Sequence, residues 1–252
     1  MQDFTAERFH VLQQIAPDHF WFEGRRRLID VILSQDLKQT AEIAVDLGCG
    51  AGDGLIAWKK HARHIIGIDA HAELIANDFD DPLVSVVTAD VSDLPLPDAS
   101  VDLVLALDVL EHVPDELALQ EAYRILRPGG TMLVAVPAYQ WLWSYRDVDA
   151  GHRRRYSKRS VRALIEGGGL TIKRIRWYQC LLFPIVVMAR LLGKRGSRMR
   201  NLEDNPPGPI SRLLLSVNLL EVKLAGMGLV MPFGSSILVT ARKPYDAAHV
   251  PS

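Results

Sequence analysis

Apolar and polar positions alternate along the first half of this 252-residue chain in blocks that predict strands and helices in turn. Short apolar runs bounded by turn residues predict strands at 43–47, 64–69, 84–91, 101–107 and 131–136. Helices are predicted between them, at 55–61 and 116–126 among others. The run 101–107 is almost continuously apolar, as expected of a strand covered by helices on both faces. The alternation predicts a parallel, doubly wound α/β sheet.

The first predicted strand ends in a run of alternating glycines, Val-Asp-Leu-Gly-Cys-Gly-Ala-Gly-Asp-Gly at 45–54. Glycine allows a tight turn and a close approach by a ligand, and a helix behind the turn would offer free N–H groups. The spacing departs from the Gly-x-Gly-x-x-Gly dinucleotide pattern, because the third glycine would fall on Asp53. Asp46 would repel a pyrophosphate and attract a cationic ligand end. A glycine turn that binds no ligand is the simpler alternative.

Two further strands end in an acidic residue. Asp69 closes the second strand, where a carboxylate can accept hydrogen bonds from both hydroxyls of a ribose, or can simply cap a helix. Asp90 follows the third strand in the segment Thr-Ala-Asp-Val. The fourth strand leads into Asp108-Val-Leu-Glu-His112.

These landmarks, in this order, resemble the core of class I S-adenosylmethionine (SAM) dependent methyltransferases over about 43–137. The resemblance implies a Rossmann-like, doubly wound, mostly parallel seven-stranded sheet with an antiparallel last strand. It implies SAM as cofactor and S-adenosylhomocysteine as product, with Asp90 at the adenine amino group. The residues implied in cofactor binding, including a lid near the N-terminus, are Asp46, Gly48, Cys49, Gly50, Gly52, Asp69, Ala70, Asp90, Val91, Leu107, Trp21 and Arg25. The subfamily resembles the ubiquinone and menaquinone methyltransferase group, and the flanks 18–27 and 151–156 resemble uncharacterised methyltransferases encoded near glycan and lipid biosynthesis genes.

Composition bears on the partners, the cellular location and the number of domains of the protein. Lys and Arg (29) nearly balance Asp and Glu (30), so no global charge favours nucleic acid, and the Asn/Asp-Pro-Pro-aromatic motif of nucleic acid base methyltransferases is absent after the fourth strand. Two cysteines indicate no disulfide framework, and the first residues lack the apolar core of a signal peptide, so a cytoplasmic protein is expected. One domain over 1–252 is expected, with an N-terminal helical lid (1–40), a core (41–180), an apolar helical insertion (181–233) between the sixth and seventh strands, and the last strand (234–243).

The insertion is long for a connection between neighbouring strands, which predicts a structure of its own. Its apolar blocks, 181–192 and 210–231, flank a basic, Pro-rich linker at 194–209, and neither is a convincing membrane-spanning helix. Three interpretations remain open: a helical cap packed on the domain, a cap that also lies in a membrane interface, and a dimer interface. The chain is expected to be a monomer or a homodimer.

Candidate catalytic residues are His152, His112 and Asp108, all expected at the sheet edge where ligands bind. A base is required only if the acceptor is protonated, and Asp147 and Asp149 could orient His152 for that task. Asp147, Asp149 and His152 could also bind a metal, but three candidate ligands in one loop are a weak signal, and no metal is expected. Substrate contacts are expected from Arg153, Arg154, Arg155 and Tyr156, although arginine runs usually face solvent.

The sequence therefore predicts an enzyme that transfers a methyl group from SAM to a small apolar or lipid-linked acceptor by O- or C-methylation, with possible peripheral membrane contact. The alternatives are methylation of a soluble sugar or other metabolite, and a SAM-binding protein without catalysis.

Overall fold

A computed structural model describes residues 19–52, 54–75, 79, 81–192 and 207–245 of the chain. Seven strands form one sheet in the order β3-β2-β1-β4-β5-β7-β6. They are β1 (Ala41–Leu47), β2 (Ala62–Asp69), β3 (Val84–Thr88), β4 (Val101–Leu107), β5 (Leu126–Pro137), β6 (Thr171–Tyr178) and β7 (Ser236–Arg242). β1 to β5 pair in parallel, and β7 is antiparallel to both of its neighbours, β5 and β6. The predicted fold class is confirmed.

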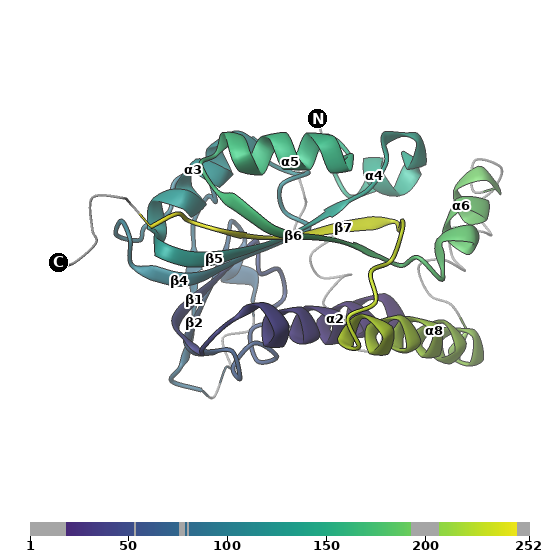
Figure 1. Cartoon of the computed structure of the whole chain (residues 1–252), viewed down its shortest axis with the longest axis horizontal. Helices are drawn as coiled ribbons and strands as arrows, with labels where there is room; N and C mark the ends of the chain where they lie inside the picture. The colour runs from purple at the N-terminus through teal and green to yellow at the C-terminus, as the bar shows by residue number, and fades with distance from the viewer. Residues whose placement is uncertain (1–18, 53, 76–78, 80, 193–206, 246–252) are drawn as a thin grey trace.

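Helices cover both faces of this sheet (Figure 1). One face carries α3 (Asp115–Ile125) and α5 (Lys158–Gly167), and the other carries α2 (Phe20–Asp36) and α8 (Gly208–Gly226). Successive residues of β4 serve opposite faces: Val104 and Ala106 join the core under α3 and α5, whereas Leu103 and Leu105 join the core under α2. Period-two burial on both faces explains why the strand is continuously apolar.

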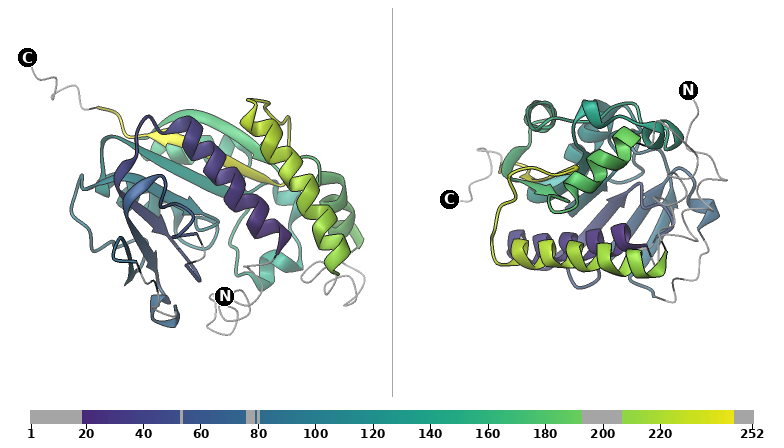
Figure 2. Two further views of the ribbon diagram at one scale, coloured as in Figure 1. Left: turned by 90° about the horizontal axis from the view of Figure 1, so that it is seen from below. Right: turned by 90° about the vertical axis from the view of Figure 1, so that its right-hand side faces the viewer.

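The insertion between β6 and β7 is helical in its described parts. α8 lies alongside α2 (Figure 2), where the Asn218 amide donates to the Phe20 carbonyl at 3.3 Å, and Gly24 of α2 approaches so closely that a Cβ there would lie 2.8 Å from the Asn218 Cβ. α6 (Phe183–Leu192) stands apart from both layers at one end of the sheet. The predicted basic linker falls largely on 193–206, outside the described residues. No described helix is long and apolar enough to cross a bilayer.

Two predicted features differ from the structure: the segment 55–61 and the boundary between α3 and β5. The segment 55–61 forms consecutive turns instead of a helix: Leu55 and Trp58 are buried as in a helix, but hydrogen bonds such as His61 N to Trp58 O (2.8 Å) span three residues. α3 ends before the glycine pair at 129–130, and β5 already begins at Leu126, because a residue that precedes a proline, here Arg127, favours extended backbone.

α2 buries Leu28, Ile29, Ile32 and Leu33 against the sheet, so most of this helix is a layer of the fold. The predicted N-terminal lid over 1–40 stays a prediction, because residues 1–18 lie outside the described part of the chain.

Candidate functional site

The carboxyl ends of the parallel strands bring the predicted cofactor residues to one edge of the sheet. Leu47, the last residue of β1, pairs with Ile68 of β2 and with Ala106 of β4, and Asp69 pairs with Thr88 of β3. The acidic residues and glycines that follow these strands therefore emerge side by side, as parallel pairing requires.

The glycine loop adopts the conformation that its residues predict. Gly48, Gly50 and Gly52 have φ values of 62°, 55° and 81°, which side chains other than glycine's disfavour. A Cβ on Gly48 would lie 2.6 Å from a methyl carbon of Val109, so this glycine is required by packing. A Cβ on Gly50 would meet no atom within 4 Å. The backbone at Gly50 thus has room beside it for a ligand.

Asp69 holds the loop and retains further hydrogen-bonding capacity. Its Oδ2 accepts from the Gly50 backbone N–H at 2.9 Å, and its Oδ1 accepts from the His71 N–H at 2.9 Å. Each carboxylate oxygen has a second lone pair. Asp69 therefore acts as a local cap and can also accept from a ligand hydroxyl. Ala70, the next residue, is exposed.

Asp46 is a buried carboxylate beneath the glycine loop, with only 5% of its surface exposed. Its Oδ2 accepts a hydrogen bond from the Trp58 indole at 3.2 Å. Burial raises the pKa of Asp46 to about 7, although the Trp58 hydrogen bond and the nearby Arg25 charge oppose the rise. A cationic ligand group would stabilise the ionised form of this side chain.

Arg25 in the second turn of α2 lies above the same edge. It stacks on Trp21, with its guanidinium carbon 4.8 Å from the ring centroid, and forms an ion pair with Asp108. Burial lowers the pKa of Arg25 to about 10, against the opposing effect of the Glu111 and Asp46 carboxylates. Its Nη2 is buried without a hydrogen-bond partner among the described residues. That free donor suits a ligand carboxylate.

Asp108 follows Leu107, the last residue of β4, with a left-handed φ of 56°. The turn directs its carboxylate to Arg25 and makes Asp108 an anchor for that side chain. After β3, Asp90 is exposed and accepts hydrogen bonds from the backbone N–H and the hydroxyl of Ser92, and the hydroxyl bond lowers the pKa of Asp90. Its neighbour Val91 is buried, as is expected of a residue that shapes the wall behind a ligand.

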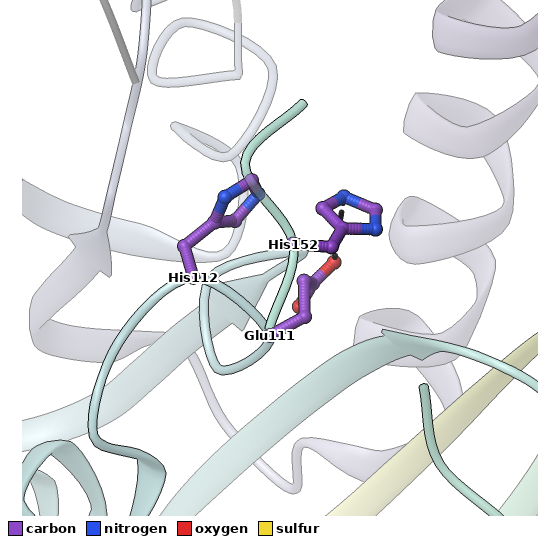
Figure 3. Close-up of side chains that lie close together, drawn as sticks. All are labelled: Glu111, His112 and His152. Atoms are coloured by element: carbon purple, nitrogen blue, oxygen red, sulfur yellow. Dashed lines mark ion pairs between the residues drawn. The ribbon is translucent and has the colours of Figure 1, made fainter. Parts of the chain in front are cut away.

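His152, His112 and Glu111 form a second cluster on the loops that follow β4 and β5 (Figure 3). The His112 and His152 rings lie 4.7 Å apart in an edge-to-face arrangement, and the His152 Nε2 lies 4.0 Å from the Glu111 Oε1. A backbone hydrogen bond of 2.7 Å, from Arg153 N–H to the Glu111 carbonyl, joins the two loops. The structure thus brings together two of the three predicted catalytic residues.

Asp147 orients His152. Its Oδ1 lies 2.8 Å from the His152 Nδ1, and it also accepts from the Arg155 Nε at 2.7 Å and from the Ser144 N–H at 2.8 Å. Burial alone would raise the pKa of Asp147, but the hydrogen bonds from His152 and Arg155 outweigh it and hold the pKa well below its usual range. An ionised Asp147 fixes the proton of His152 on Nδ1 and directs Nε2 towards Glu111.

The predicted substrate-contact run divides into internal and exposed members. Arg155 is committed to Asp147, and the buried Tyr156 hydroxyl donates to Asp115 at 2.7 Å. Arg154 pairs with the same Asp115 at 2.7 Å but remains 43% exposed, and Arg153 is exposed. Arg153 and Arg154 thus remain available to a substrate, whereas Arg155 and Tyr156 stabilise the loop.

Glu111 is the residue that reasoning from the sequence missed. Its side chain has no exposed surface, and both carboxylate oxygens lack a hydrogen-bond partner among the described residues. Burial raises the pKa of Glu111 to about 8, although its own backbone N–H, and after it the charges of Arg25 and Arg155, oppose the rise. In the sequence it is one acidic residue beside His112, and only its burial distinguishes it.

Comparisons with known proteins agree with this geometry. Residues 45–134 match the family model described as a methyltransferase domain. A probable S-adenosylmethionine-dependent methyltransferase of Mycolicibacterium smegmatis is 30% identical over 177 residues, which cover 67% of this chain and 65% of that protein. Another from Mycobacterium tuberculosis, Rv3030, is 34% identical over 135 residues, covering 53% and 47% of the two chains. The chain thus matches less than two thirds of the length of these relatives.

Among solved structures, a chain in a complex with the Haloferax volcanii Trm112 methyltransferase activator superposes with a TM-score of 0.65 at 20% identity, over 97% of this chain and 99% of that one. This likeness shows a shared fold. The sequence matches agree with the strand order and the glycine loop. The unpartnered Arg25 donor suits the carboxylate of SAM, and the buried Asp46 suits its ammonium group. The open space at Gly50 allows the cofactor to approach the backbone closely. Residues 45–134 therefore form a methyltransferase domain of the class I S-adenosylmethionine-dependent family, and SAM is the cofactor of that domain.

Proposed function

We propose that this protein transfers the methyl group of SAM to a small apolar or lipid-linked acceptor by O- or C-methylation. The observation that carries the proposal is the arrangement at one sheet edge, where a glycine loop with open space at Gly50 lies on β1 and a histidine–carboxylate cluster follows β4 and β5. The first part suits the cofactor and the second suits an acceptor that has to lose a proton.

The proposed cofactor contacts follow from the free hydrogen-bonding groups. Arg25 offers its unpartnered Nη2 to the cofactor carboxylate, and Asp46 offers a charge partner for its ammonium group. Asp69 and Asp90 accept from the ribose hydroxyls and the adenine amino group. When bound, SAM supplies a methyl group that its sulfonium charge has already activated.

The residues of the chain would align the acceptor and manage its proton. Transfer to a hydroxyl breaks the S–CH₃ bond, forms an O–CH₃ bond and releases the hydroxyl proton. We assign the acceptance of that proton to His152, because Asp147 holds its Nδ1 and leaves Nε2 as the acceptor. Asp108 positions Arg25, His112 lines the cluster beside His152, and Arg153 and Arg154 are assigned to an anionic part of the acceptor.

Aromatic and aliphatic side chains beside the cluster favour an apolar acceptor. Phe183, at the start of α6, lies 5.8 Å from Tyr139 and 6.1 Å from Trp141 between ring centroids, and Trp141 is 62% exposed. α6 starts just after β6, which runs parallel to β5, so it begins at the same edge as the glycine loop. Ile185 and Met188 of α6 are also exposed. We assign this apolar surface to the apolar part of the acceptor.

A hydrogen-bond chain links this apolar surface to the cluster. Arg190 of α6 donates to the Ser144 hydroxyl, and the Ser144 backbone N–H donates to Asp147, which orients His152. An apolar acceptor that contacts α6 would therefore lie next to the groups assigned to its proton. A soluble sugar, with its many hydroxyl groups, would bury less apolar surface against these exposed side chains.

Isothermal titration with SAM, S-adenosylhomocysteine and NAD tests the first step, and binding of NAD without SAM would refute the proposal. The acceptor class is tested by incubating the protein with methyl-labelled SAM and a cell extract, followed by organic extraction. Label in the organic phase that Asp69→Ala abolishes supports an apolar acceptor. Label confined to the aqueous phase supports a soluble metabolite, and SAM binding without any transfer supports a non-catalytic SAM-binding protein.

Contact of the 181–233 insertion with the cytoplasmic face of a membrane is a further part of the proposal. It is supported by exposed apolar side chains on both described helices, Ile185 and Met188 on α6 and Ile210 and Leu213 on α8. Flotation with vesicles that contain anionic lipid at low salt should carry the folded protein upward. Absence of flotation would leave the insertion as a cap packed on the domain.

A further inference from the structure

The cluster of Glu111, His112 and His152 has the composition of a metal site. Each residue offers one ligand atom, a carboxylate oxygen or a ring nitrogen, and these atoms all lie within 4.8 Å of one another. Figure 3 shows the His152 ring and the Glu111 carboxylate next to each other, with His112 beside them. Two imidazoles and one carboxylate are a recurrent ligand set for first-row transition metals.

Glu111 provides an independent indication of a ligand. Its carboxylate is completely buried, and neither oxygen has a hydrogen-bond partner in the described part of the chain. A buried carboxylate with no partner is costly to a fold. The Arg25 and Arg155 guanidinium groups, which influence it electrostatically, are directed to Asp108 and Asp147 instead. A divalent cation at the cluster would give the Glu111 carboxylate a partner.

His152 already has the support that metal-bound histidines share. A ligating histidine usually donates its other ring N–H to a carboxylate, which fixes the tautomer and raises the basicity of the ligand nitrogen. The Asp147 Oδ1 lies 2.8 Å from the His152 Nδ1, and Asp147 is itself held by Arg155 and Ser144. This leaves His152 Nε2 facing Glu111 at 4.0 Å.

Binding an ion would draw the ligand atoms, which now lie up to 4.8 Å apart, closer together. Ligands at about 2.1 Å from a tetrahedral ion lie about 3.4 Å apart. The 4.0 Å separation of His152 Nε2 and Glu111 Oε1 would shorten by about half an ångström, which side-chain rotation can supply. Both loops are already joined through the Arg153 N–H to Glu111 carbonyl bond of 2.7 Å. These ligands differ from the three considered from the sequence, which were Asp147, Asp149 and His152. In the structure Asp147 bonds to His152, and Asp149 is exposed outside the cluster.

We propose that Glu111, His112 and His152 bind a divalent first-row transition metal ion, with at least one coordination position left open towards the acceptor. This inference rests on the proposed function for its consequence and not for the site itself. An acceptor oxygen in the open position would lose its proton more readily. With the ion in place, His152 would serve as a ligand and the ion would take over its assigned role in favouring proton loss.

The test uses the full-length, tag-free protein, stripped with a chelator and dialysed. Titration with CoCl₂, followed by calorimetry and visible absorption, should show about one ion per chain and the d–d bands of a four- or five-coordinate site. Glu111→Gln and His152→Ala should each weaken Co²⁺ binding by about tenfold or more, and Asp147→Asn by about 10–100-fold. His64→Ala is the matched control, because His64 is exposed on β2 and should bind as the parent does.

Circular dichroism establishes that each variant is folded. Substoichiometric Co²⁺ binding by the folded parent would overturn the inference, as would affinity unchanged in both Glu111→Gln and His152→Ala. SAM titration of the same samples separates this result from the proposed function. SAM binding without Co²⁺ binding refutes only the metal site, whereas Co²⁺ binding without SAM binding refutes the proposed function and leaves the metal site intact.

Discussion

Replacing Asp46 by asparagine tests whether the carboxylate beneath the glycine loop is poised for a cationic ligand. In the folded chain, burial raises the pKa of Asp46 from 3.8 to about 7. A pKa that is higher in the folded state makes the folded protein bind more protons than the unfolded one. The stability contribution is therefore complete below about pH 4 and is lost as the pH rises through about 7.

The magnitude follows from the same values. The full rise is equivalent to about 4 kcal/mol, and about 2–3 kcal/mol of it falls between pH 5 and pH 8. Asp46→Asn removes this titration and keeps an oxygen that can accept the Trp58 hydrogen bond. The new amide NH₂ group changes the absolute stability, but its contribution does not vary with pH.

Urea denaturation at pH 5, 6, 7 and 8 without cofactor provides the measurement. As the pH rises from 5 to 8, the parent should lose about 2–3 kcal/mol of unfolding free energy relative to Asp46→Asn. Asp149→Asn is the control, because Asp149 is exposed, and its difference should stay flat. A shift below about 0.5 kcal/mol for Asp46→Asn would refute the view that Asp46 is desolvated. The same variant should bind SAM more weakly at pH 8, where the parent carboxylate is ionised.

Further variants separate cofactor binding from packing. Asp69→Ala should weaken SAM affinity by about 1.5–3 kcal/mol in calorimetry, because hydrogen bonds to a charged group are lost; an unchanged affinity in the folded variant would make Asp69 a cap only. Gly50→Ala should cost about 1–2 kcal/mol of stability, for its positive φ, and reduce SAM affinity. Gly48→Ala should cost more stability, because its Cβ would contact a buried valine at 2.6 Å; equal losses would contradict the difference in packing. Asp36→Ala should lower the unfolding free energy by about 3–5 kcal/mol at pH 7, since it leaves the half-buried Arg176 without its partner; the loss should shrink as the pH falls, because the bonds from Arg176 and Thr240 overcome desolvation and lower the pKa of Asp36.

The order of the first five strands and the glycine loop were accessible from local signals: apolar runs of strand length, glycines at 48, 50 and 52, and acidic residues where strands end. The seven-stranded sheet with an antiparallel last strand was implied by the resemblance to class I methyltransferases. The start of α5 is equally local, since Ser157 and Ser160 form the capping box that begins it. Local chemistry specifies such elements because neighbours along the chain supply most of the interaction.

Other local patterns were overridden by packing. The segment 55–61 has a helical pattern but forms turns that bury Leu55 and Trp58, and Trp58 reaches Asp46. Glu221 belongs to an amphipathic pattern in α8, yet it is buried and accepts from the backbone N–H groups of Cys180 and Leu181 at 3.1 Å. The partners of these side chains lie far away in the sequence, so no local pattern indicates them.

The site shows the same division. Sequence alone determined which residues end the strands, and parallel pairing then placed Asp46, Asp69 and Asp108 at one edge. Tertiary structure alone decided that Tyr156 bonds to Asp115, that Arg155 pairs with Asp147, and that Glu111 is buried beside His152. The physical reason is that burial and pairing with distant residues decide the charge state and the bonding partners of a charged side chain. Its residue type and its position in the sequence do not reveal either of them.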